Sequence, residues 1–255
     1  ILLMVFAGYY SAANAQHNAY RCHQGPNYSY IIDDFQQMES GFLRYEQQYN
    51  SAPAYSQERD RALKRMNLIK KNALRDLQNA RLSEELRGHE IENFTLDLES
   101  KYSQAPAYSV KRDFYLKAKN ITWQAYQIKA KMELECMAYF RDAFDAAENY
   151  NIKYTSAPAY SQKRDNYLKL MRAAYEQGLV LIDSEINYFR GAYMKLEDIA
   201  VEFYNKFQSA AAYSVKRDSY LKASNKLFEG TLEVFERRVP RMKLQRLERL
   251  ASKYE

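Results

Sequence analysis

Apolar residues recur at steps of three and four along most of the chain. The pattern continues without a slip from Ile121 to Tyr150 and again from Leu168 to Phe207. Such a period over many turns is typical of long helices packed against one another. We therefore expect a shorter first helix, long helices after it, and a last segment that Pro240 starts or kinks. The expected ranges are about 28–49, 56–103, 109–154, 161–208 and 214–238.

A repeat of about 53 residues divides this pattern. Four nearly identical stretches read Ala-Pro-Ala-Tyr-Ser-x-x-Arg-Asp, with alanine replacing proline in the last. Their marker tyrosines, spaced 53, 52 and 53 residues apart, are Tyr55, Tyr108, Tyr160 and Tyr213. The spacing indicates tandem duplication, with repeat junctions near 51–56, 104–109, 156–161 and 209–214.

Each junction has the composition of a turn that leads into a helix. Pro53 suits the first turn of a helix, where its missing N–H costs nothing. A serine before the tyrosine, such as Ser51, or after it, such as Ser56, is a good N-cap. Asp60 favours the positive end of the helix dipole. We expect the junctions to be turns between helices.

Two all-α folds fit four such repeats. In an elongated antiparallel bundle, each repeat is one long helix joined to the next by an Ala-Pro-Ala-Tyr-Ser turn. In an α-solenoid, each repeat holds a helix pair and needs a second turn at the same place in every copy. The candidate helix breakers fall 33, 18, 31 and 27 residues after their own marker tyrosines and share no register: Gly88, Gly178, Gly191 and Pro240. This favours the bundle, whose weakest point is near Gly88.

The first fifteen residues resemble a secretory signal that is truncated at its start. Residues 1–7 are apolar, and Ala13-Asn14-Ala15 before Gln16 fits a signal-peptidase site. The apolar run is shorter than the roughly 20 residues that span a membrane. We expect a signal peptide over 1–15, an N-terminal segment over 16–27 and one helical repeat domain over 28–255. The predicted location is periplasmic or secreted, in a bacterium.

Export makes the two cysteines candidates for a disulfide. A bond between Cys22 and Cys136 would fasten the N-terminal segment to the helices. The alternative is two unpaired thiols, with Cys136 packing as a small apolar residue.

The chain lacks the motifs of catalysis, so we expect no enzyme and no cofactor. It has three histidines, no glycine-rich phosphate loop and no Gly-x-Ser-x-Gly elbow. His17, Cys22 and His23 lie close together in sequence, but no fourth ligand is near, and no metal site is predicted.

The repeated junctions are the candidate binding site. A helix start with serine, arginine and lysine suits an anion, and tyrosine suits stacking on a sugar. The competing interpretation is that these residues only cap helices and anchor the turn, which the repeated aspartate favours. The candidate residues are Tyr55, Arg59, Asp60, Tyr108, Arg112, Asp113, Tyr160, Arg164, Asp165, Tyr213, Arg217 and Asp218.

Charge adds a second candidate surface near the C-terminus. The whole chain carries a net charge of +6, and one short segment, amphipathic if helical, supplies it. This basic tail suits an anionic membrane, an acidic glycan or an acidic protein, or forms a final bundle helix with a solvated face. Its residues are Arg237, Arg238, Arg241, Lys243, Arg246, Arg249 and Lys253.

These features predict an exported structural or interaction protein with a long repetitive helical surface. Its partner would be another protein or a second copy of itself, as in a scaffold or an adhesion component. The alternative is a periplasmic holdase-type chaperone or an envelope-binding module. Export argues against nucleic acid.

Overall fold

The computed structural model describes residues 30–188 and 193–251, with residues 187–188, 193–194 and 237–251 described for their backbone only. The described residues are almost entirely helical and contain no strand, which confirms the all-α prediction. No helix among them is long and apolar enough to cross a membrane. The predicted signal peptide (1–15) and N-terminal segment (16–27) lie outside the described residues.

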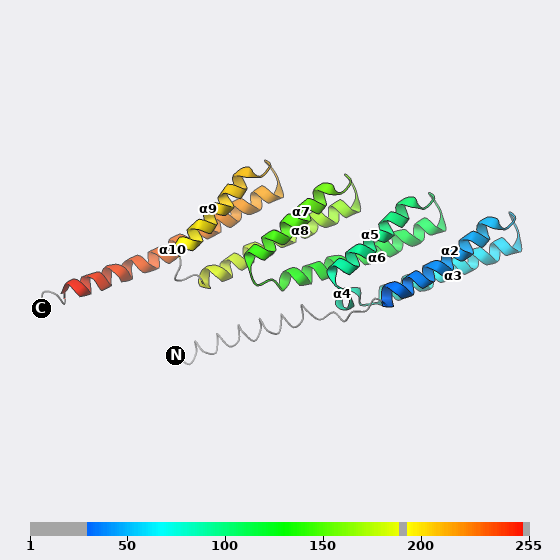
Figure 1. Ribbon diagram of the computed structural model, residues 1–255, viewed down its shortest axis with the longest axis horizontal. Helices are drawn as coiled ribbons and strands as arrows, with labels where there is room; N and C mark the ends of the chain where they lie inside the picture. The colour runs from blue at the N-terminus through cyan, green and yellow to red at the C-terminus, as the bar shows by residue number, and fades with distance from the viewer. Residues whose placement is uncertain (1–29, 189–192, 252–255) are drawn as a thin grey trace, which may run out of the picture. The chain divides into compact units, whose positions relative to one another are not determined.

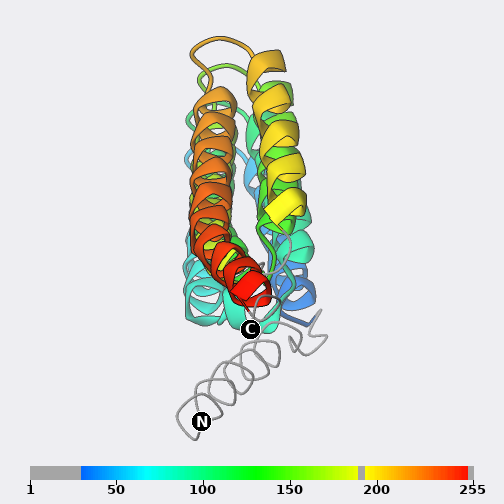
Figure 2. The ribbon, with the colours of Figure 1, turned by 90° about the vertical axis from the view of Figure 1, so that its left-hand side faces the viewer.

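The described helices form four helical hairpins and one short connecting helix (Figure 1). Figure 2 shows two helices of a hairpin, α9 and α10, lying side by side and joined by a turn at one end. Hairpin 1 is α2 (Tyr30–Ser51) with α3 (Gln57–Asn79), and α4 (Leu82–Glu85) follows it; hairpin 2 is α5 (Gly88–Gln104) with α6 (Val110–Glu135); hairpin 3 is α7 (Phe140–Ser156) with α8 (Gln162–Tyr188); hairpin 4 is α9 (Tyr193–Ser209) with α10 (Val215–Ala251).

The expected long helices are broken in the middle of each repeat. The prediction of continuous helices near 56–103, 109–154 and 161–208 is therefore wrong. Each repeat supplies the second helix of one hairpin and the first helix of the next, with the repeat junction at the hairpin turn.

The breaks share a register that becomes visible when it is counted to the following tyrosine. Helices α5, α7 and α9 all begin 20 residues before the next marker tyrosine, at Gly88, Phe140 and Tyr193. Counting from the preceding tyrosine hid this register, because the loops differ in length. The break before Phe140 contains neither glycine nor proline.

Glutamates from the second helix cap the first helix in hairpins 2 and 3. Glu133 Oε1 accepts a hydrogen bond from Gly88 N at 3.2 Å, and Glu185 Oε1 accepts one from Phe140 N at 2.8 Å. Both glutamates lie 25 residues after their marker tyrosine. A carboxylate satisfies an N–H that the first turn of a helix leaves unpaired and favours the helix dipole. Contacts within the hairpin thus stabilise a helix start that the local sequence does not signal.

Helix α10 continues through Pro240 as far as Ala251. The expected end of the fourth long helix near residue 238 is therefore wrong. A proline removes one backbone hydrogen bond, but a helix can continue past it when the other bonds remain.

The chain divides into two compact units, Ile1–Glu133 (unit 1) and Leu134–Glu255 (unit 2). Aromatic rings join the hairpins within each unit. In unit 1, Phe114 of hairpin 2 lies 5.4 Å from Phe35 and 5.0 Å from Phe42 of hairpin 1. In unit 2, Phe144 of hairpin 3 lies 4.8 Å from Phe203 of hairpin 4. Such ring pairs contribute beyond the area that they bury.

Candidate interaction site at the hairpin turns

The same serine cap begins the second helix of every described hairpin. The serine after the marker tyrosine accepts a hydrogen bond on Oγ from the backbone N–H three residues later. The donor–acceptor distances are 3.2 Å for Arg59 to Ser56, 3.0 Å for Arg112 to Ser109, 3.1 Å for Arg164 to Ser161 and 3.1 Å for Arg217 to Ser214. This bond satisfies one of the unpaired N–H groups at the helix start.

The prolines lie at the end of the preceding helix instead of the start of the next one. Pro53 follows α2, and its carbonyl accepts a hydrogen bond from Ser56 N at 3.2 Å. Ser51, a candidate cap, donates its hydroxyl back to the Gln48 carbonyl at 3.2 Å. The expected place of the prolines in the first helical turn is therefore wrong; proline often follows a helix end because it cannot continue the helix.

The four arginines of the motif stack on aromatic rings of the preceding helix. Each guanidinium lies 4.4–4.6 Å from the centre of a ring ten residues earlier in the chain. The pairs are Arg59 with Tyr49, Arg112 with Tyr102, Arg164 with Tyr154 and Arg217 with Phe207. Sequence reasoning missed these rings, although the constant spacing of ten was a signal. The arginines hold the turn together, through cation–π contacts.

The aspartates lie in the first turn of the second helix. Asp113 pairs with Lys70 at 3.2 Å and with Lys117 at 3.0 Å, and Asp218 pairs with Lys222 at 2.7 Å. Burial acts to raise the pKa of Asp113, but the hydrogen bonds from the two lysines outweigh it and lower that pKa. The other two, Asp60 and Asp165, also lie in first turns.

The marker tyrosines differ from every other residue of the turn. Their φ angles are 62°, 59°, 58° and 58° for Tyr55, Tyr108, Tyr160 and Tyr213, in the left-handed region. Their side chains are 102%, 105%, 103% and 105% exposed in the same order. A non-glycine residue in this conformation costs about 1–2 kcal/mol. Here the ring gains no burial within the chain to offset that cost.

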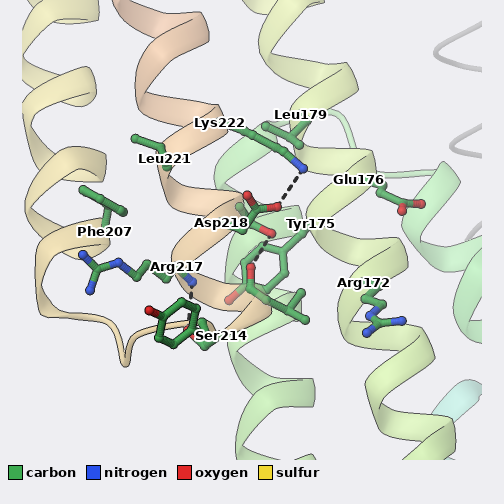
Figure 3. Close-up of a pocket in the computed structure, with 13 residues that line it drawn as sticks. Arg172, Tyr175, Glu176, Leu179, Phe207, Ser214, Arg217, Asp218, Leu221 and Lys222 are labelled. Carbon is green, nitrogen blue, oxygen red and sulfur yellow. Dashed lines mark hydrogen bonds and ion pairs between the residues drawn. The ribbon is translucent and has the colours of Figure 1, made fainter.

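A groove lies beside the turn in hairpins 2 and 4. Six of its lining positions in hairpin 2 recur 105 residues later in hairpin 4. The recurring positions in hairpin 4 are Phe207, Tyr213, Ser214, Arg217, Asp218 and Leu221. The groove of hairpin 4 has a volume of about 630 Å³ and also borders α8, and that of hairpin 2 about 400 Å³. Figure 3 shows the hairpin 4 groove, in which Lys222 reaches Asp218 and Ser214 caps Arg217.

The other sequence predictions fall partly beyond these turns. Cys136 is disulfide-bonded, and its predicted partner Cys22 lies outside the described residues, as do His17 and His23. The basic tail up to Arg249 lies in the part of α10 described for its backbone only, and Lys253 lies outside the description. Among the described residues, no group of three or more His, Cys, Asp or Glu residues could hold a metal ion.

Comparison of the chain with protein-family models, with curated proteins and with solved structures finds no match.

Proposed function

We propose that this protein is a non-catalytic interaction protein whose hairpin turns present tyrosines to a protein partner. The observation that carries the proposal is the strained, fully exposed tyrosine in each described turn. Glycine or asparagine is the usual choice for a left-handed residue. A strained backbone at a repeated exposed position is a feature of functional sites.

The structure of the turn supports this role. The serine cap and the stacked arginine fix the backbone on both sides of the tyrosine. A tyrosine ring offers a large amphipathic contact surface with few rotatable bonds, so little entropy is lost on binding. A preorganised turn lowers that loss further. Several weak tips acting together would bind a repetitive partner tightly through avidity.

Replacing the tyrosine by glycine separates this role from a structural one. If the ring serves a partner, Tyr108→Gly should leave the free energy of unfolding unchanged or raise it by up to about 1 kcal/mol, because strain is relieved while chain entropy is lost. Urea unfolding followed by circular dichroism measures this. Leu116→Gly, in the interior of α6, is the control and should destabilise. A loss above about 1 kcal/mol in Tyr108→Gly would show a structural tyrosine.

A photo-crosslinking amino acid at position 108 tests the interaction itself. Irradiation in an extract of the producing cells should give a discrete protein adduct at this position. The same group at Lys117, exposed on α6, should give none. The unlabelled chain should compete for the adduct, whereas a chain with all four marker tyrosines changed to glycine should not. Equal adducts at both positions, or competition by the glycine variant, would contradict the proposal.

A further inference from the structure

Within unit 1, hairpin 2 docks on hairpin 1 in a defined register. Tyr115, seven residues after its marker tyrosine, donates to Glu39 Oε1 at 2.7 Å. Lys111, three residues after the same marker, reaches Glu46 at 3.0 Å. Glu39 and Glu46 lie 16 and 9 residues before the marker of hairpin 1. These positions define a receiving side on the first hairpin and an incoming side on the second.

Unit 2 repeats the arrangement. Lys216 and Tyr220, at the same positions of hairpin 4, reach Glu148 of hairpin 3 at 2.7 and 2.8 Å. Glu148 lies 12 residues before its marker. A receiving side is thus built from the positions 16, 12 and 9 residues before a marker tyrosine.

Hairpin 4 carries the same receiving side, but that side is exposed. We call it the receiving face; its residues are Glu197, Val201, Tyr204, Leu232 and Phe235. Glu197 is exposed, and the others are 45%, 40%, 60% and 47% exposed in that order. The contrast is greatest at Phe235, because its equivalents in hairpins 1 and 3, Leu77 and Ile182, are 2% and 0% exposed. Isolated exposed apolar residues are ordinary, but four at docking positions of one hairpin indicate an interaction surface.

Hairpin 1 carries an incoming side that is also exposed. We call it the incoming face; its residues are Arg61, Arg65 and Leu68. The two arginines are exposed at positions where hairpin 2 buries Phe114 and Ala118, both 0% exposed. Leu68 is 49% exposed. The incoming face is therefore basic with one apolar residue.

We propose that the receiving face of hairpin 4 binds the incoming face of hairpin 1 of a second copy of this chain. The register that places Tyr115 against Glu39 places Arg61 of the second copy beside Glu197, its charge complement. Leu68 meets the apolar residues of the receiving face. The contact joins two different surfaces, so it is heterologous and continues from copy to copy until a ring closes or the series stays open. It does not involve the tyrosine tips.

Charge reversal tests this contact directly. Sedimentation of the full chain over a dilution series should show concentration-dependent association. Glu197→Arg and Arg61→Glu should each weaken association at least about tenfold, because each places like charges together. The double variant Glu197→Arg/Arg61→Glu should restore it. A mixture of the two single variants should also associate, as alternating copies, because each face then meets a complementary charge on the other variant.

Matched controls separate the contact from a general effect of charge. Asp198→Arg and Lys71→Glu make the same charge changes at exposed positions outside the two faces, and association should remain. Circular dichroism checks that every variant is folded. A wild-type chain that stays monomeric at all concentrations, or a double variant as weak as the singles, would overturn the proposal. Glycine at all four marker positions should leave this association intact, so failure here and failure of the tips are distinguishable.

Discussion

Units 1 and 2 join their hairpins with the same donors but different acceptors. The donors on the incoming hairpin are Lys111 and Tyr115 in unit 1, and Lys216 and Tyr220 in unit 2, 105 residues apart in sequence. In unit 1 they reach two different glutamates, Glu46 and Glu39. In unit 2 they both reach one, Glu148.

The second helix of the receiving hairpin accounts for part of this difference. In unit 2, Tyr175 also donates to Glu148, at 2.9 Å, so one carboxylate holds three donors. Its equivalent in unit 1 is Lys70, which pairs with Asp113 instead. The acceptor has moved along the helix by one to two turns while the contact between hairpins is retained. The comparison suggests that duplication kept the docking function and left the choice of acid free.

Removing the shared acceptor of unit 2 should have the largest effect. Glu148→Ala leaves Lys216 and two half-buried phenols without their acceptor. We expect a loss of about 3 kcal/mol in the free energy of unfolding, measured by urea titration with circular dichroism. Glu39→Ala in unit 1 should cost less, about 2 kcal/mol, because Glu46 still holds Lys111.

Glu176→Ala is the matched control for this substitution. Glu176 is exposed on α8, next to Tyr175 in the sequence, and its removal should change the free energy of unfolding by less than about 0.5 kcal/mol. A Glu148→Ala variant as stable as this control would mean that the three hydrogen bonds add nothing to docking.

Acid should weaken the unit 2 cluster in a way that depends on Glu148. Burial acts to raise the pKa of Glu148, but the hydrogen bonds from Lys216, Tyr220 and Tyr175 outweigh it, and the pKa is lowered from 4.5. A carboxylate with a lowered pKa in the folded state contributes stability above its unfolded pKa and loses it as the pH falls through the folded pKa.

The melting temperatures of the wild type and Glu148→Gln, followed from about pH 6 to about pH 3, measure this contribution. The wild type should be more stable at pH 6, and the difference should shrink below about pH 4.5. A difference that stays constant over this range would show that the charge of Glu148 is not involved. The effect should be smaller than that of Glu148→Ala, since glutamine still accepts hydrogen bonds.

The sequence was sufficient to predict the helical class and the serine caps after the tyrosines, because both depend on local pattern and short-range bonds. The breaks inside the repeats were not predictable in the same way. The break before Phe140 lacks glycine and proline, and a carboxylate 45 residues away, on Glu185, caps the helix after it. Helical periodicity continues across such a break, so the pattern alone favoured one long helix.

The candidate site was predicted by position but not by role. The motif arginines were expected to contact a ligand, yet their rings at Tyr49, Tyr102, Tyr154 and Phe207 show that they hold the turn. The left-handed conformation of the tyrosines could not be predicted, since L-residues other than glycine, asparagine and aspartate rarely adopt it.

A single hydroxyl group gives the finest test of the difference between the units. Glu39 Oε1 accepts from Tyr115, and Lys101 bonds the other oxygen, Oε2, at 2.8 Å. Glu148 Oε1 accepts from both Tyr175 and Tyr220. Tyr115→Phe therefore leaves a half-satisfied buried carboxylate and should cost about 1.5 kcal/mol, whereas Tyr220→Phe should cost about 0.5–1 kcal/mol because Tyr175 remains. Urea unfolding of both variants measures the ranking, and an equal or reversed order would mean that the two clusters are equivalent in spite of their different acids.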